Sequence, residues 1–541
     1  MSSHDPSAPA GPPALPLVIQ VGFSGARRLY DEKVYPHIDS AAFESQVASQ
    51  LAALLKEIPG KLKLDSDSFY FCGISQIAIG GDSAFTRACE MAGWSQRIFL
   101  PQHRDEYLAA QGSVGPDFTQ AQRENALSLL KLPHIIQERL VSDAQVRSHR
   151  FQDANLEVVR VSDFVIAMTR SEQEGKVGGA HEFAELAKKR RKPVLKIVVS
   201  VASDGTAKVD PEWSGIEHFH PPVLPHALEE EISQPSPGSE FPDAATYAAW
   251  LKNRFSPLAG KQSKQFIRAA FIIIGTHIVA TLLAVIALKI HSVVVLLFLA
   301  LEIGLLITGF AIHQRLHATH AVSRWADFRL TAEIARSLRA IDGFHAYLEH
   351  LFDLPFPPSF RPLLRTLSYL HLRSAPRNDD NWEAQRDAYV KTRLTDPKVK
   401  AQIPYQESTR DDAERYLTLA RGFFMFAALS AIGATLTKLV ALGIALSFHH
   451  EGCESIASLA GVFAILLPVL AVAALSLATA LDLEAKKHTS EEMLIFLKEQ
   501  KALILAASSP REFRRLLIET ESRLLGETVA WHPRRSFLGI A

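Results

Sequence analysis

Four long apolar segments constrain the fold of this chain more than any other feature of its sequence. They cover about residues 266–288, 292–312, 422–448 and 456–481 of the 541. Each has about the 20 apolar residues with which a helix rising about 1.5 Å per residue crosses about 30 Å of hydrocarbon. Two close pairs of such helices are hard to explain as soluble core, so the pattern predicts an all-α, four-helix transmembrane domain within residues 261–541.

The basic residues next to these segments predict their orientation. Lysines and arginines precede the first span, follow the second, precede the third and follow the fourth. The other two turns, "LKIHS" and "SFHHEGCES", contain a single lysine between them. Because loops rich in lysine and arginine stay in the cytoplasm, we expect a multi-pass protein of the inner, cytoplasmic membrane with both termini in the cytoplasm.

Composition argues against several classes of protein. Lysine plus arginine and aspartate plus glutamate both number 58, so no net charge favours a nucleic-acid partner. The three cysteines, Cys72, Cys89 and Cys453, are too widely spaced for a disulfide framework or a zinc site, and we expect no metal and no cofactor. The opening "MSSHDPSAPAGPP" lacks the apolar stretch of a signal peptide, so residues 1–15 are expected to form a disordered leader.

Residues 16–200 alternate strand-like and helix-like patterns. Runs such as "LVIQVGF", "FYFCGISQIAI", "FVIAM" and "VLKIVV" are typical of buried strands. Between them lie amphipathic segments such as "DSAAFESQVASQLAALLKEIPG", which begins with the capping residues Asp39 and Ser40. This alternation predicts an α/β, Rossmann-like domain in which helices cover both faces of a parallel sheet.

The segments that follow are less regular. Residues 201–260 hold eight prolines, which at this density indicate an extended connector. Residues 320–420, between the second and third spans, and the tail after about residue 486 are expected to be cytoplasmic helical segments.

Three glycine-containing loops at the ends of predicted strands form the candidate binding site. In a parallel α/β sheet, ligands bind beyond the carboxyl ends of the strands, where glycines allow close approach and helix N-termini attract anions. Any one loop is more simply a tight turn, but three in equivalent positions, two of them basic, favour a pocket for an anionic ligand. The first loop contributes Gly22, Ser24, Gly25, Arg27 and Arg28, the second Gly80, Gly81, Asp82 and Ser83, and the third Lys176, Gly178, Gly179, His181 and Glu182.

The order of these loops resembles the SLOG superfamily, which includes the LOG phosphoribohydrolases, DprA-like proteins and the N-terminal domains of TRPM-type channels. The resemblance covers residues 16–200 and rests on "VGFSGARRL", "IAIGGDSAFTRACEMAGWSQRIFL" and "VRVSDFVIAMTRSEQEGKVGGAHEFAELAKKRRKPVLKIV". It implies that the first loop meets phosphate or ribose. It also implies a sensor of a nucleotide-derived second messenger, such as a cyclic nucleotide or an ADP-ribose derivative.

Departures from the family pattern bear on catalysis. Ala26 stands where the family usually has histidine, and Ala180-His181 replaces its threonine region. The Pro-Gly-Gly-x-Gly-Thr-x-x-Glu pattern of the hydrolases in this superfamily is incomplete here. The resemblance therefore favours binding over hydrolysis, and an enzyme would use Glu182 as general acid or base and Arg27 as phosphate clamp.

The membrane part resembles the SLATT group of membrane effector modules, which occur beside SLOG domains in bacterial defence loci. The resemblance rests on "RWADFRLTAE", "NWEAQRDAYV", "AQIPYQESTRDDAERY" and "GETVAWHP", in this order. In the first segment, Trp325, Arg329 and Glu333 recur every four residues and so share one helical face. The resemblance implies a homo-oligomer that opens a pore or disrupts the membrane in antiphage defence by abortive infection.

Three ionisable residues lie inside the predicted spans. Glu302 and Lys438 are each about 13–15 Å from the far-side turns at about 1.5 Å per residue, and His277 is at a similar depth. An ionised group there costs at least about 2.5–3.5 kcal/mol, so each is expected to face a partner or water. Two interpretations stay open: a structural Glu302–Lys438 pair, within one chain or between subunits, or groups that line or gate a pore.

Two functions are consistent with these patterns. The first is a membrane effector in which a nucleotide messenger binds one state of the sensor more tightly and thereby opens the membrane part. The second is a membrane-anchored nucleosidase or NAD hydrolase of the LOG type. Four spans with charges near the midplane exceed what an anchor requires, which favours the first. A constitutive transporter would show paired interrupted helices, which the sequence lacks.

Overall fold

The protein divides into two compact units. The computed structural model describes residues 17–64, 68–108, 118–171, 179–232, 243–287, 293–342, 354–374, 381–399, 401–448 and 451–537. The first unit, here called the α/β unit, comprises the chain up to Asp243 together with residues 358–375. The second, here called the helical unit, comprises residues 244–357 and 376–541.

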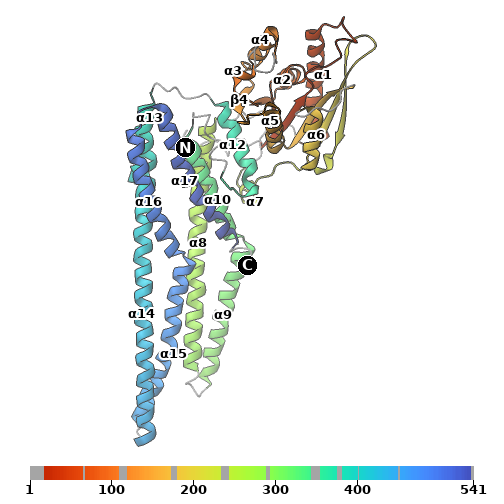
Figure 1. Ribbon diagram of the computed structural model, residues 1–541. Helices are drawn as coiled ribbons and strands as arrows, with labels where there is room; N and C mark the ends of the chain where they lie inside the picture. Colours follow the sequence, from red (N-terminus) through yellow and green to blue (C-terminus); the bar gives the residue numbers. More distant parts are fainter. Residues whose placement is uncertain are drawn as a thin grey trace, which may run out of the picture. The chain divides into compact units, whose positions relative to one another are not determined.

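A seven-stranded sheet forms the centre of the α/β unit, in the order β4-β3-β2-β1-β5-β6-β7 (Figure 1). Strands β1 to β6 run parallel, and the edge strand β7 runs antiparallel to β6. The prediction of a parallel α/β sheet is confirmed. The strands are β1 Leu17–Gly25, β2 Phe69–Ser75, β3 Ser95–Leu100, β4 Ile135–Leu140, β5 Phe164–Arg170, β6 Val194–Val201 and β7 Ala207–Ser214.

Helices cover both faces of this sheet because its central strands are apolar on both sides. In β5, Phe164, Ile166 and Met168 enter the core formed with α1 and α2, whereas Val165 and Ala167 enter the core formed with α5 and α6. Such two-sided burial is the reason that central parallel strands read as continuous apolar runs. The helices of this unit up to residue 189 are α1 Ser40–Lys61, α2 Gly81–Ala92, α3 Arg104–Tyr107, α4 Gln120–Leu129, α5 Arg147–Val161 and α6 Ala180–Lys189.

The segment predicted to be an extended connector contains regular structure instead. Residues 207–214 form β7, and Pro211 is tolerated there because an edge strand leaves one row of its N–H groups unpaired. The short helix α7 (His226–Glu229) follows, and α8 begins at Ala244 and continues through Pro257. The prediction of an extended connector, drawn from the proline density of residues 201–260, therefore does not fit β7, α7 and the start of α8.

One helix from the predicted membrane domain belongs to the α/β unit. Helix α12 (Arg361–Arg373) lies in the sequence between the second and third apolar segments, yet it packs on β1 and β4. Five of its leucines are buried: Leu363, Leu364, Leu367, Leu370 and Leu372. The sequence shows an amphipathic helix here but not the surface that it covers, so its assignment to the membrane domain differs from the structure.

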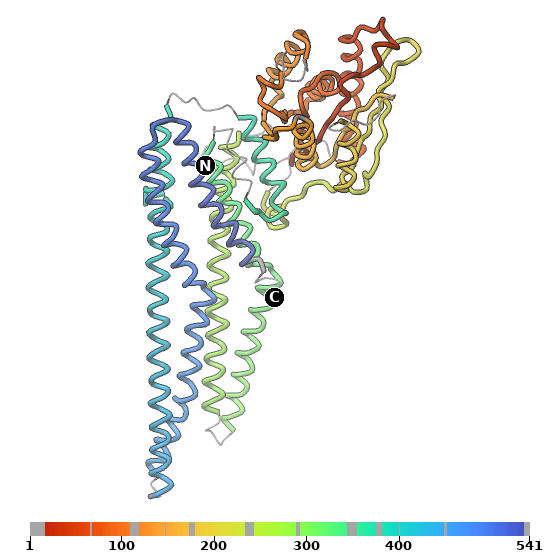
Figure 2. The backbone as a smooth tube through the Cα atoms, in the orientation of Figure 1, coloured from red at the N-terminus to blue at the C-terminus, as the bar shows by residue number. Residues whose placement is uncertain are grey.

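The helical unit contains four long helices in a row, in the order α9, α8, α15, α14 (Figures 1 and 2). Helix α9 packs on α8, α8 on α15 and α15 on α14, which makes α9 and α14 the outer helices. The bounds are α8 Ala244–Ala287, α9 Val294–Ala318, α10 Ala321–Ala340, α13 Trp382–Tyr389, α14 Gln402–Phe448, α15 Glu451–Ala480, α16 Leu483–Ala506 and α17 Pro510–Phe537.

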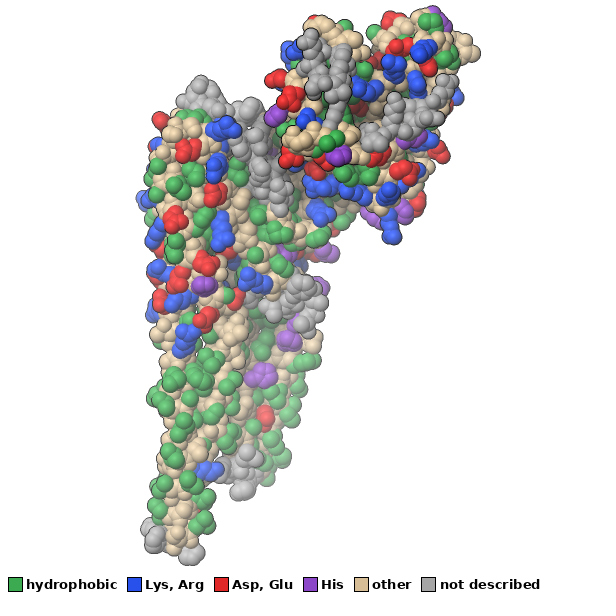
Figure 3. Space-filling view, in the orientation of Figure 1, with side chains coloured by type: hydrophobic (Ala, Val, Ile, Leu, Met, Phe, Trp, Pro, Cys, Tyr) green, Lys and Arg blue, Asp and Glu red, His purple; other side chains and the backbone are tan. Residues whose placement is uncertain are grey.

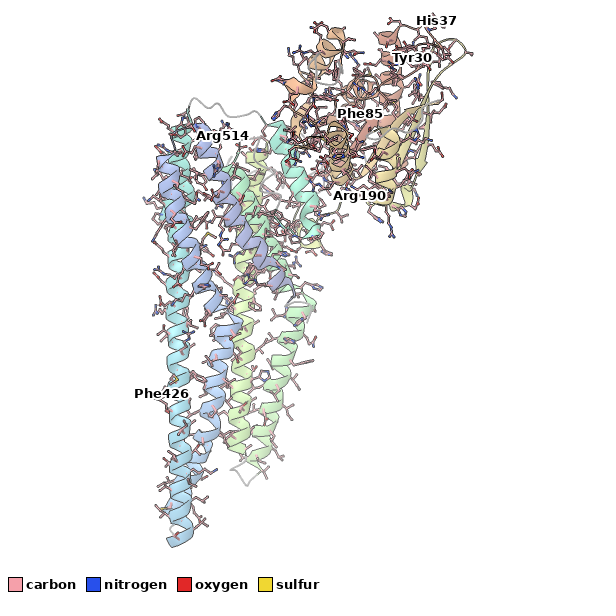
Figure 4. All side chains as sticks on the ribbon, viewed as in Figure 1. Tyr30, His37, Phe85, Arg190, Phe426 and Arg514 are labelled. Atoms are coloured by element: carbon pink, nitrogen blue, oxygen red, sulfur yellow. The ribbon has the colours of Figure 1, made fainter. Side chains whose placement is uncertain are left out.

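Within the described residues, four helices are long and apolar enough to cross a membrane, which is the number that the sequence predicts. Figure 3 shows hydrophobic side chains over the lower part of this unit and charged side chains over its upper part. Phe426 of α14 is 67% exposed and points away from the neighbouring helices (Figure 4). Exposed apolar side chains on long helices fit contact with lipid better than contact with water.

Candidate functional site

The strand order places the candidate site at one point of the sheet edge. Strands β1 to β4 follow one another outward on one side, and β5 to β7 follow on the other, so the order reverses between β1 and β5. Ligands of open α/β sheets bind beyond the carboxyl ends of the strands at this kind of reversal, because the two flanking loops diverge there and leave a crevice. The first and third predicted loops follow β1 and β5, the strands on either side of the reversal.

The first and second predicted loops are joined by hydrogen bonds. The Asp82 carboxylate accepts from the N–H groups of Gly25 (3.2 Å) and Ala78 (3.1 Å). The Gly81 N–H donates to the Ala26 carbonyl at 2.9 Å, and the Ala26 N–H donates to the Met168 carbonyl of β5 at 2.9 Å. The loop after β1 is therefore held by its neighbours on both sides.

Glycine is required where these two loops cross. A Cβ on Gly25 would lie 2.7 Å from the Cα of Gly81, and one on Gly80 would lie 2.5 Å from the Arg27 carbonyl oxygen. Gly80 also has φ +75°, a conformation that side chains disfavour. By contrast, Gly22 lies inside β1, where a Cβ would meet Ser162 and Val158 of the α5 region, so its role in the structure is close helix packing.

Asp82 and Ser83 are buried, and their side chains form hydrogen bonds with the backbone of the loops. Asp82 is 5% exposed, and burial raises the pKa of its carboxyl to about 6, although the two backbone N–H groups and Arg27 act in the opposite direction. The Ser83 hydroxyl donates to the Ala78 carbonyl at 3.0 Å. The structure thus gives both side chains a hydrogen-bonding role in the loop framework.

The raised pKa of Asp82 gives a testable pH dependence. The folded state favours the protonated carboxyl, so its contribution to stability is full below the unfolded pKa and is lost as the pH rises through the folded value. Relative to the Asp82→Asn variant, the α/β unit should lose about 2–3 kcal/mol of unfolding free energy between about pH 4 and pH 6. Urea titration with hydrogen exchange of β1 and β2 measures this difference. A difference that stays constant with pH would show that burial does not control this carboxyl.

Positive charge lies at the rim of this framework. Arg27 and Arg28 are exposed at the end of the first loop. Arg170, the last residue of β5, donates from its guanidinium to the Tyr30 carbonyl at 3.2 Å and so links β5 to the segment that follows β1. Sequence reasoning missed Arg170, because the only signal was a lone arginine at a strand end. Guanidinium groups at this edge suit an anionic ligand.

The third predicted loop is described only from Gly179 onward. Lys176 and Gly178 lie outside the described residues, while Gly179 precedes α6, and His181 and Glu182 are in its first turn. Glu182 accepts a hydrogen bond from Gln152 of α5 at 3.1 Å. A cavity of about 440 Å³ opens beside it between α5 and α6, lined by Ala144, His149, Gln152, Asp153, Leu156, Glu182 and Leu186. Glu182 therefore faces α5 on the opposite side of the sheet from α2.

The ionisable residues of the apolar helices do not form one intrachain pair in the described structure. Glu302 is on α9 and Lys438 is on α14, the two outer helices of the row. The Lys438 side chain instead lies over Gly461 of α15, where a Cβ would be 3.4 Å from the lysine Nζ. Of the two interpretations left open by the sequence, a pair within one chain is not formed here.

Two of the short segments singled out in the predicted membrane domain, "RWADFRLTAE" and "GETVAWHP", contact each other. Trp325 of α10 contacts Trp531 of α17 with ring centroids 5.1 Å apart, and the Arg329 guanidinium lies 4.5 Å above the Trp531 ring. Asp327 and His532 share a hydrogen bond of 2.8 Å. Segments about 200 residues apart in the sequence thus form one cluster.

The described residues contain no group of three or more His, Cys, Asp or Glu side chains placed to hold a metal ion. No protein-family model, curated protein or solved structure matches this chain.

Proposed function

We propose that this protein is a membrane effector that opens a pore, or disrupts the membrane, when its α/β unit binds a phosphate-bearing, nucleotide-derived second messenger. The observation that carries the proposal is the glycine loop after β1, which lies at the strand reversal and is joined by hydrogen bonds to the glycine loop after β2. Arg27, Arg28 and Arg170 lie at its rim, and the same chain contains four apolar helices. The α/β unit would be a Rossmann-like sensor of the SLOG type, and the helical unit an effector of the SLATT type.

The proposal includes a location and a setting. Both termini would lie in the cytoplasm and the four helices would cross the inner membrane as a homo-oligomer. In bacterial antiphage defence, a messenger made on infection would bind the sensor and stop the growth of the cell by abortive infection. A ligand acts as such a switch only when it binds one of two states more tightly.

Helix α12 supports a route from the ligand to the membrane. Tyr70, Ser95 and Asp163 stand at the amino ends of β2, β3 and β5 or directly before them, and α12 contacts all three. The chain leaves α12 on both sides for the helical unit. A shift of the strands caused by a ligand at their carboxyl ends would thus be passed to segments that precede and follow the apolar helices.

A membrane-anchored nucleosidase or nucleotide hydrolase is the alternative, and Glu182 beside the 440 Å³ cavity favours it. The two functions predict different outcomes in one experiment. Purified full-length protein in dye-loaded liposomes would be incubated with cyclic oligonucleotides, ADP-ribose derivatives and NAD. Dye release with intact nucleotide supports the effector, and turnover without release supports the enzyme.

Arginine substitutions test the site itself. Arg27→Ala and Arg170→Ala should each weaken nucleotide binding by about tenfold or more, because each removes a charge-assisted contact worth about 1.5–3 kcal/mol. Arg190→Ala is the matched control, since Arg190 directly follows α6 and lies at the opposite end of the unit from Tyr30 (Figure 4). Normal binding by both site variants would identify the first loop as a simple turn.

A further inference from the structure

A stripe of ionisable side chains runs along α9. Glu302, Gly309, His313 and His317 are spaced by seven, four and four residues. At 3.6 residues per turn, these spacings keep all four positions within about 80° of one another around the helix. The His313 and His317 rings contact each other, with centroids 4.4 Å apart. The stripe thus contains one carboxyl and two imidazoles, with a gap at Gly309.

A third imidazole from α8 fills that gap. Gly309 is buried against α8. A Cβ added at Gly309 would lie closest to atoms of Thr276 and would be 3.9 Å from the His277 Nε2. His277 therefore stands level with Gly309, between Glu302 on one side and His313 on the other. Along the axis, it is about 10 Å from Glu302 and about 6 Å from His313 at about 1.5 Å per residue.

We propose that Glu302, His277, His313 and His317 form a hydrated path for protons along the α8–α9 pair. Chains of carboxyl and imidazole groups inside membranes carry protons in pumps and transporters. In this path each group accepts a proton from one neighbour or water and passes a proton to the next. No other covalent bond forms or breaks. The Glu302 carboxyl lies near the middle of the membrane, and the histidines lie closer to the C-terminal end of α9. The path therefore runs from mid-membrane toward that end of the helix.

The same residues do not suit a metal ion. Ligand atoms must all lie within about 2.0–2.2 Å of one zinc ion, whereas the four groups are spread over four turns of helix. Fixed charge along the apolar length of this helix pair is sparse. Residues 266–287 of α8 have Arg268, α9 has Arg315, α10 has Arg324 and Asp327 in its first two turns, and α15 has none from residue 455 to 480; Lys261 and Lys264 precede the apolar part of α8. Over that apolar length, Glu302, His277, His313 and His317 are thus most of the ionisable groups.

Cysteine labelling tests the path without opening the pore. In full-length protein whose native cysteines are replaced, Glu302→Cys, His277→Cys and His313→Cys should react with a charged methanethiosulfonate reagent much faster than Thr308→Cys. Thr308 is on α9 but about 120° away from Glu302, and its hydroxyl donates to the Gly304 carbonyl in its own helix. Equal, slow labelling at all four positions would show a dry stripe and overturn the proposal.

Proton flux tests transport and separates this inference from the proposed function, on which it partly rests. Proteoliposomes containing a pH dye are given a potassium gradient and valinomycin, with each nucleotide of the panel. Glu302→Gln and His277→Gln should lose proton influx, and Thr308→Val should keep it. Unchanged influx in both the Glu302→Gln and the His277→Gln variants contradicts the path. Absence of any flux with every nucleotide contradicts the proposed function, and the labelling result then decides on the path.

Discussion

Replacing Glu521 by glutamine should lower the unfolding free energy of the helical unit by about 3–5 kcal/mol, the cost of leaving a buried charge without its partner. The Glu521 side chain is fully buried and that of Arg393 is 11% exposed. The Arg393 guanidinium donates to both carboxylate oxygens at 2.9 and 2.8 Å, and the Tyr389 hydroxyl donates to the same carboxylate at 2.8 Å. This pair joins α17 to the π-helical turn that follows α13.

Circular dichroism during urea or thermal unfolding in detergent measures this loss. Glu484→Gln is the matched control, because Glu484 bonds to Arg421 through a similar pair of contacts but is 75% exposed. Solvent-exposed pairs contribute little to stability, so the control should unfold close to the wild type. Equal losses of unfolding free energy in the two variants would show that burial of the Glu521–Arg393 pair does not increase the cost of breaking it.

Replacing Arg365 by alanine should separate ligand binding from the membrane response. Arg365 of α12 forms an ion pair with Asp163, whose carboxylate also accepts from the Gln20 N–H at 2.8 Å. One turn later, the Tyr369 hydroxyl lies 2.9 Å from the Ser95 hydroxyl, and Arg373 lies above the Tyr369 ring. These contacts are at the amino ends of the strands, away from the predicted ligand.

The Arg365→Ala variant should therefore bind the nucleotide with nearly unchanged affinity and lose most nucleotide-triggered dye release. Arg361→Ala serves as the control, because Arg361 begins the same helix and is exposed. Adding Asp163→Ala to Arg365→Ala should cause no further loss if the two side chains act as one contact. Full dye release from the Arg365→Ala variant would exclude α12 as the route to the membrane.

The features that could be predicted from the sequence are those that depend on patterns of neighbouring residues. The four apolar segments, the apolar runs of β1, β2, β5 and β6, and the Asp39 cap of α1 all appear where the residues predict them. The cap forms because the Asp39 carboxylate accepts from the Ala41 N–H at 3.0 Å. Periodicity and capping act over a few residues, so a single sequence is enough to reveal them.

The features that were missed depend on contacts between distant residues. Strand β7 is polar and contains Pro211, so only its pairing with β6 identifies it. Placing α12 on the α/β unit requires knowing that Arg365 meets Asp163, 202 residues away. Likewise, Arg170 becomes a site candidate only because β5 lies beside β1. Convergence of all three loops was expected; the structure joins the first two, and most of the third lies outside the described residues. The burial of Asp82 between the first two was not expected.

Hydrogen exchange of the full-length protein in lipid nanodiscs, with and without a nucleotide that binds, tests most directly whether the sensor changes the membrane part. We expect protection at residues 25–30 and 78–83 and at the end of β5, together with altered exchange in α12 and at the ends of α8, α10 and α14. Protection confined to the α/β unit, with every helix of the helical unit unchanged, would contradict a sensor-gated effector.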